Sequence, residues 1–150
     1  MANCFLLESL HIVGVPMEEQ DVDVLAGLGS KLKVLRFERV VRSELAVVLA
    51  VKASCVEKLS AVDVQSSITD TLVREILYKM PTLSELDFRG CANVTFDGVT
   101  EVLLEILEGP SSSMFRIQKL CLAGVAGYSL ERAEELESRI SRLPVALHIV

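Results

Sequence analysis

Apolar residues recur along the chain in a fixed pattern, in which two lie three positions apart and a third follows two positions later. Five copies are complete and a sixth is partial: Leu7-Leu10-Ile12, Leu32-Leu35-Phe37, Leu59-Val62-Val64, Leu83-Leu86-Phe88, Ile117-Leu120-Leu122 and Leu147-Ile149. The middle apolar positions, 10, 35, 62, 86, 120 and 147, are separated by 25, 27, 24, 34 and 27 residues. A period of this size indicates a chain built from repeated structural units.

Within each copy the pattern predicts a strand followed by a helix. The alternation in Ser9-Leu10-His11-Ile12-Val13 is typical of a strand with one buried face. Between the copies apolar residues fall at helical spacing, within 22–28, 45–49, 72–77, 99–107 and 133–143. Capping residues mark the expected helix starts at Ser43, Thr69, Thr95 and Ser129, and the expected ends at Gly29, Pro81, Gly109 and Pro144.

Polar residues within the predicted strands indicate whether helices cover one face of the sheet or both. Strands buried on both faces are continuously apolar, whereas these strands carry His11, Arg36, Asp63, Asp87 and Lys119 beside their leucines. One face of the sheet therefore meets water. The sequence predicts an α/β fold over residues 1–150: a single-domain right-handed solenoid of about five repeats and a closing strand, with a concave parallel sheet and convex helices.

The fourth copy, Leu83–Val99, resembles the cysteine-containing leucine-rich repeat of F-box-associated and ribonuclease-inhibitor-like proteins. It follows the pattern L-x-x-L-x-L-x-x-C-x-x-[IV]-T with Cys91 in the cysteine position, and Ile68–Leu72 extends the likeness to the third copy. The resemblance implies a horseshoe solenoid in which Cys91 is buried and structural. It also implies a scaffold that binds a protein partner.

Three other roles of related repeat proteins stay open as alternatives. One is a regulatory subunit that inhibits or activates an enzyme, and another is the substrate-recognition arm of a ubiquitin ligase. The third is an assembly factor of a mitochondrial complex, because Leu143–Val150 resembles the last strand of small repeat proteins of that kind.

The amino-acid composition limits the cellular compartments and the kinds of partner that we expect. The chain is 51% hydrophobic, but its most apolar run, Leu45–Val51, is far shorter than the roughly 20 residues that span a bilayer, so no membrane insertion is expected. The net charge of −6 disfavours nucleic acid and favours a basic protein surface. The scattered cysteines, Cys4, Cys55, Cys91 and Cys121, predict reduced thiols in the cytoplasm, with the nucleus or mitochondrion as alternatives.

Residues that alternate with the leucines define the predicted concave surface. The central column is expected to contain His11, Arg36, Asp63, Asp87, Cys121 and His148. The two flanking columns are Ser9, Val34, Ala61, Glu85, Lys119, Ala146 and Val13, Glu38, Gln65, Arg89, Ala123, Val150. From these columns we expect the partner to be bound by His11, Arg36, Glu38, Asp63, Gln65, Glu85, Asp87, Arg89 and Lys119.

The charges on this surface suggest what the partner carries. Asp63 and Asp87 are expected on neighbouring strands about 4.8 Å apart, with Glu85 beside them, and like charges so close favour a cation between them. A basic segment of the partner would supply that cation. Internal neutralisation by the neighbouring basic side chains stays open as the alternative.

The predicted surface also places Cys121 beside His148, which raises the question of catalysis or metal binding. In a nucleophilic site the acid orients the base, whereas here Asp87 would flank the cysteine. We therefore expect no catalytic residue, no metal ligand and no cofactor. The loop-like stretch 27–31 is expected to end a helix rather than to cradle a phosphate.

The two outer strands form the last expected feature. Ser9–Val13 and Ala146–Val150 would present bare parallel edges, and such edges recruit other chains. The sequence therefore predicts a longer repeat array, edge-to-edge self-association, or a partner that docks edgewise.

Overall fold

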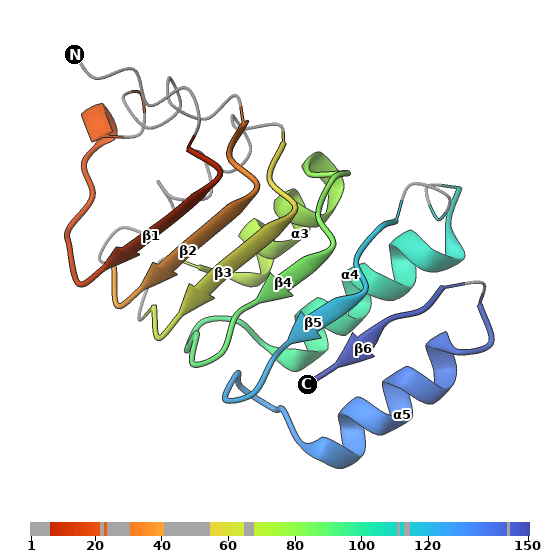
Figure 1. The fold of residues 1–150 in the computed structure, drawn as a ribbon. Coiled ribbons are helices and arrows are strands. Elements are labelled where there is room, and N and C mark those ends of the chain that lie inside the picture. Colours follow the sequence, from red (N-terminus) through yellow and green to blue (C-terminus); the bar gives the residue numbers. More distant parts are fainter. Residues whose placement is uncertain are drawn as a thin grey trace.

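A six-stranded parallel sheet, open at both ends, forms the centre of the computed structural model, which describes residues 7–21, 23, 31–40, 55–64, 68–110, 112, 115–143 and 145–150. The strands lie side by side in chain order (Figure 1). They are β1 (Ser9–Val13), β2 (Val34–Glu38), β3 (Lys58–Val62), β4 (Glu85–Asp87), β5 (Lys119–Cys121) and β6 (His148–Ile149). The predicted α/β class and the parallel sheet are confirmed.

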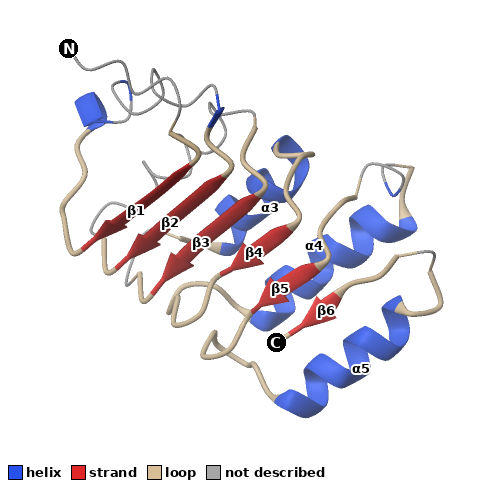
Figure 2. Ribbon diagram, in the orientation of Figure 1, coloured by secondary structure: helices blue, strands red, loops and turns tan. Residues whose placement is uncertain are grey.

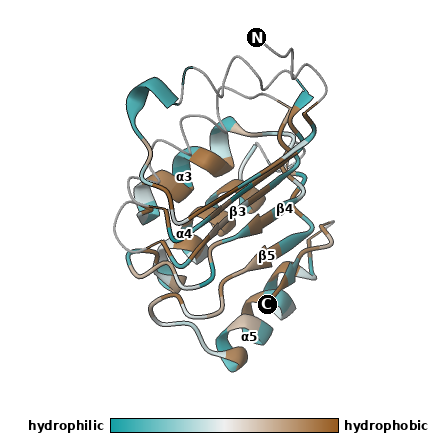
Figure 3. Ribbon diagram, turned by 60° about the vertical axis from the view of Figure 1, so that its left-hand side comes forward, coloured by the Kyte–Doolittle hydropathy of each residue, from teal (hydrophilic) through white to brown (hydrophobic). Residues whose placement is uncertain are grey.

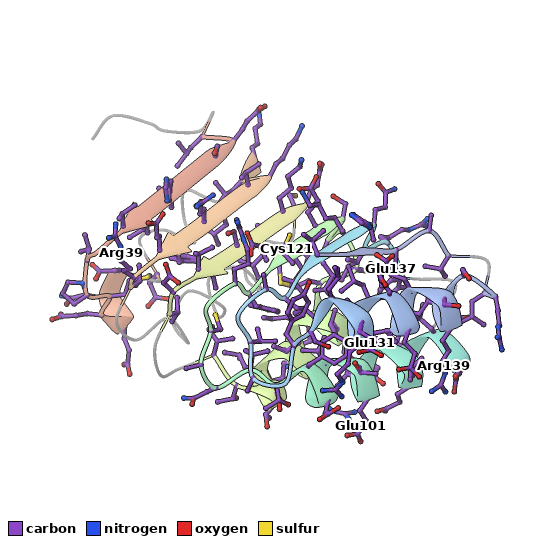
Figure 4. All side chains as sticks on the ribbon, turned by 90° about the horizontal axis from the view of Figure 1, so that it is seen from below. Arg39, Glu101, Cys121, Glu131, Glu137 and Arg139 are labelled. Atoms are coloured by element: carbon purple, nitrogen blue, oxygen red, sulfur yellow. The ribbon has the colours of Figure 1, made fainter. Side chains whose placement is uncertain are left out.

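Helices α3 (Asp70–Lys79), α4 (Phe96–Glu108) and α5 (Leu130–Ile140) connect the last four strands. Figures 1 and 2 show these helices on one side of the sheet, and the view from below agrees (Figure 4). The other face of the sheet meets solvent. Across the described part of the chain, no helix combines the length and the apolar character that crossing a bilayer requires.

Side-chain caps fix where the three helices begin. Thr69, Thr95 and Ser129 each accept a hydrogen bond from a backbone N–H of the first helical turn, as predicted. Gly109 ends α4 and Pro81 follows the end of α3, also as predicted. The expected boundaries at Ser43, Gly29 and Pro144 lie outside the described residues.

Polar contacts hold neighbouring helices together. Asp70 of α3 accepts hydrogen bonds from the backbone N–H and the hydroxyl of Thr95, at 2.7 and 2.6 Å, so one helix anchors the cap of the next. Gly98 lies against this carboxylate, where an added Cβ would come within 2.3 Å of it. Arg74 of α3 pairs with Glu105 of α4 at 2.6 Å.

The core is one cluster that extends from Met17 to Ile149, between the sheet and the helices. Figure 3 shows hydrophobic stretches, in brown, on both the strands and α3. Cys91 is fully buried, and its Sγ lies 3.0 Å from the carbonyl oxygen of Ala61, so its thiol acts as a hydrogen-bond donor inside the core. Burial raises the pKa of this thiol to about 11, which is consistent with the structural role that the resemblance implies.

The register of β3 differs from the prediction. Leu59, not Val62, pairs with Leu35 and Leu86, so the third copy is shifted by three residues. Ala61 consequently lies in the core with 2% of its surface exposed, and Asp63 lies beyond the strand. With Leu59, the larger apolar residues Val62 and Val64 match the apolar spacing of the repeat. The pairing of β3 with β2 nevertheless places the smaller Ala61 inward.

The last strand is also shifted. Ile149 pairs with Leu120, and His148 pairs with Lys119. The central position beside Cys121 is occupied by Val150, whose N–H and C=O bond to the backbones of Leu120 and Leu122. His148 is therefore in the flanking column instead of Ala146, and it is not adjacent to Cys121.

Each of the strands β1 to β5 is followed by a residue in the left-handed conformation, four positions after the leucine in the middle of the repeat. The φ angles are 65° at Gly14, 53° at Arg39, 53° at Asp63, 72° at Gly90 and 82° at Gly124. The N–H of each of the first four donates to the carbonyl oxygen of the residue that precedes the next left-handed residue, at 2.9–3.1 Å. Asp63 thus belongs to this turn and not to the central column.

Candidate binding groove on the open face of the sheet

A groove of about 310 Å³ crosses strands β2 to β5 and reaches Val150, after β6, on the face without helices. Two columns of side chains run across this face, one at the start of each strand and one two residues later; Ser9, His11 and His148 belong to these columns but lie outside the groove. The first column is Ser9, Val34, Lys58, Glu85, Lys119 and His148, and the second is His11, Arg36, Ser60, Asp87, Cys121 and Val150. Each column runs across the sheet, so residues from all repeats share one surface.

The carboxylates in the groove already have partners within the chain. Arg89 holds Asp87 through two nitrogens, with Nε 3.0 Å from Oδ1 and Nη2 2.7 Å from Oδ2. Ser60 Oγ lies 3.4 Å from the same carboxylate. This hydrogen bonding raises the pKa of the Arg89 guanidinium, and only 16% of the Asp87 side chain is exposed.

Glu85 is neutralised from the neighbouring strand. Its Oε1 lies 2.6 Å from Nζ of Lys58, and both side chains are roughly half exposed. For these two carboxylates, therefore, the alternative of internal neutralisation describes the observed contacts. Arg89 supplies one pair as expected, while Lys58 was not among the expected residues.

Glu38 lies among three basic side chains at the β1 side of the groove. Its carboxylate lies 3.6 Å from His11 Nε2, 3.5 Å from Arg36 Nη2 and 3.2 Å from Arg39 Nη2. Figure 4 shows Arg39 near the β1 and β2 end of the sheet and Cys121 towards β5. One carboxylate thus faces three basic side chains.

Of the nine residues expected to bind a partner, seven lie on the open face: His11, Arg36, Glu38, Glu85, Asp87, Arg89 and Lys119. Asp63 does not join them, because it occupies the left-handed turn against Gly90. The expected Asp63–Asp87 pair is wrong, since Ser60 is the residue opposite Asp87. Gln65 lies outside the described residues.

Two groove residues, Lys58 and Ser60, were missed because the third copy was counted from Val62. A sequence signal for the correct count exists. A left-handed residue follows the middle leucine by four positions at Gly14, Gly90 and Gly124, and Asp63, a residue type that tolerates this conformation, follows Leu59 by the same distance.

Cys121 and His148 are not brought together as a reactive pair. Cys121 is 8% exposed, and burial raises the pKa of its thiol. His148 Nδ1 instead contacts Glu137 Oε1 at 2.8 Å. Among the residues that the structure describes, no group of three or more His, Cys, Asp or Glu side chains is placed to hold a metal ion.

No family model matches this chain, and no curated protein matches it.

Proposed function

We propose that the chain is a short leucine-rich repeat solenoid that binds a protein partner in the groove on its open face and performs no chemistry there. The resemblance of Leu83–Val99 supports the family, and the strands in chain order with helices on one side suit a solenoid. In such proteins the face without helices is the extended surface available to a partner.

The observation that carries this proposal is the groove itself. Contacts between its own strands, such as Lys58 with Glu85 and Arg89 with Asp87, hold its polar side chains in place. Ordered side chains lose less conformational entropy when a partner binds, which favours association. The groove crosses four strands, β2 to β5, and reaches Val150, which suits a segment of a protein better than a small molecule.

The compartment we propose is the cytoplasm, with the nucleus or mitochondrion as alternatives. Cys55, Cys91 and Cys121 are free thiols in the described part of the chain, which suits a reducing environment.

Site-specific photo-crosslinking in the native cell tests the function. A crosslinking residue at Val34 lies in the groove, and the matched control at Glu134 is exposed on α5. We expect a defined protein adduct from Val34 and none from Glu134. An adduct only from Glu134, equal adducts from both positions, or none from either would overturn the proposal.

A further inference from the structure

We infer that the groove takes an acidic, extended segment of the partner rather than the basic segment that the sequence suggests. This inference rests on the proposed function and specifies the chemistry of the partner. Its basis is the arrangement of charges that line the groove and the way in which they are already paired.

Positive side chains outnumber negative ones in the groove. Four basic residues, Arg36, Lys58, Arg89 and Lys119, line it together with two acidic residues, Glu85 and Asp87. Lys58 neutralises Glu85 and Arg89 neutralises Asp87. The groove is therefore cationic, although the whole chain carries a net charge of −6.

Arg36 is only weakly satisfied within the chain. Its ion pair is the 3.5 Å contact from Nη2 to Glu38, and Glu38 lies closer to Arg39, at 3.2 Å. The Nε of Arg36 is buried and has no hydrogen-bond acceptor among the described residues. The Arg36 side chain is 39% exposed, so a carboxylate of the partner can reach its Nη nitrogens, and charge-assisted hydrogen bonds to a guanidinium are strong.

Lys119 provides a second cation that a partner could bind. It lies opposite Glu85 in the sheet register, but the Glu85 carboxylate is bound to Lys58 from the other side at 2.6 Å. Within the part of the chain that the structure describes, Lys119 forms no ion pair, and its side chain is exposed. An added carboxylate at this position would find a cation without displacing an existing pair.

The positions of these two cations predict the spacing of acidic residues in the partner. Arg36 on β2 and Lys119 on β5 are three strand spacings apart across the sheet and two residues apart along the strands, which together give about 16 Å. An extended chain covers about 3.3 Å per residue, so two carboxylates about five residues apart would reach both cations. We expect an extended segment because the groove runs across the strands.

Peptide binding measured by fluorescence anisotropy at low salt tests the inference. The probes are a labelled decapeptide of alternating glutamate and serine, the corresponding lysine and serine peptide, and a labelled ten-nucleotide oligothymidylate. We expect the glutamate peptide to bind most tightly. Lys119→Glu should weaken it about three- to tenfold, the effect of removing and reversing one exposed charge pair.

Arg142→Glu is the matched control, because it makes the same change in net charge at an exposed position outside the groove. It should leave affinity within about twofold of the unchanged protein, since distant exposed charges are screened. If Lys119→Glu fails to fold, as judged by circular dichroism, Lys119→Gln and Arg142→Gln repeat the comparison.

Tighter binding of the lysine peptide or the oligothymidylate, no binding of the glutamate peptide, or equal losses in the two variants would overturn the acidic segment. These results are distinguishable from failure of the proposed function. An adduct from Val34 with a basic partner segment overturns only this inference, whereas absence of that adduct overturns the binding function itself.

Discussion

Glu137 of α5 accepts a hydrogen bond from the backbone N–H of Ile149, in the last strand of the sheet. The N–H groups of His148 and Val150 point to β5, so that of Ile149 points to the outer edge. A helix side chain therefore caps the donor that an added strand would need. The bare edge expected over Ala146–Val150 is closed at this point, and edgewise docking remains a prediction for Ser9–Val13.

Removing this cap should loosen the edge. We expect Glu137→Ala to lower the free energy of unfolding by about 1–2 kcal/mol, because the Ile149 donor and His148 lose their partner. It should also increase self-association, since exposed strand edges pair with other chains. Urea denaturation and light scattering at several protein concentrations measure the two effects.

Glu134→Ala is the control on the same helix. Glu134 is exposed, so its removal should change stability by less than about 0.5 kcal/mol and leave the association state unchanged. Equal behaviour of the two variants would show that the contact with Ile149 does not protect the edge.

The buried leucines of the strands should contribute most to the free energy of unfolding. Leu86 is 1% exposed in the core, and we expect Leu86→Ala to cost about 2–5 kcal/mol through lost burial and a cavity. Leu130→Ala is the matched control because Leu130 is 65% exposed, and it should cost less than about 0.5 kcal/mol. Thermal denaturation checks both, and similar costs would contradict the observed facing of β4.

The left-handed turn after β4 should be more sensitive than the one after β1. Gly14 and Gly90 both have positive φ, but a Cβ at Gly90 would lie 2.2 Å from Asp63 Oδ1, while nothing lies within 4 Å of one at Gly14. We expect Gly14→Ala to cost about 1 kcal/mol from backbone strain alone. Gly90→Ala should cost about 1–2 kcal/mol more.

The additional cost at Gly90 should depend on the Asp63 side chain. In an Asp63→Ala background the clash with Oδ1 is absent, so the costs of Gly90→Ala and Gly14→Ala should converge. Denaturant midpoints of the single and double variants measure this coupling. An unchanged cost of Gly90→Ala in that background would assign the effect to the backbone alone.

The cysteines should react with iodoacetamide in the order of exposure and thiolate content. Cys55 is exposed, whereas Cys91 is buried with its pKa raised to about 11, so at pH 8 only about one in a thousand Cys91 thiols is ionised. Burial also raises the pKa of Cys121. Of the three described cysteines, we expect Cys55 to be labelled first and Cys91 last, as followed by peptide mapping of the folded protein. Early labelling of Cys91 would contradict its place in the core.

The sequence was sufficient to predict the six strands and the three described helices between the last four of them, because apolar spacing reports directly which residues are buried; the helices expected within 22–28 and 45–49 lie mostly outside the described residues. The caps at Thr69, Thr95 and Ser129 were predictable for a similar reason, since capping is a local interaction. These features depend on residues that are near one another along the chain.

The register of β3 and the pairing of charges were not predictable in the same way. Ala61 is too small to stand out from Val62 and Val64, so side-chain size alone gave an incorrect count. The Lys58–Glu85 pair depends on that register and on the rotamers of both side chains. Both features arise from contacts between strands, which spacing within one repeat does not contain.

The order of the strands along the sheet has a consequence for folding kinetics. Every strand pairs with the one that precedes or follows it in the chain, so each pairing closes a loop of a few tens of residues and none joins the two ends. Such local connectivity lowers the entropy cost of nucleation and lets folding start at any pair and spread to its neighbours. Amide hydrogen exchange should accordingly be slowest at β3 and β4 and faster towards β1 and β6, because the outer strands each have a single neighbour.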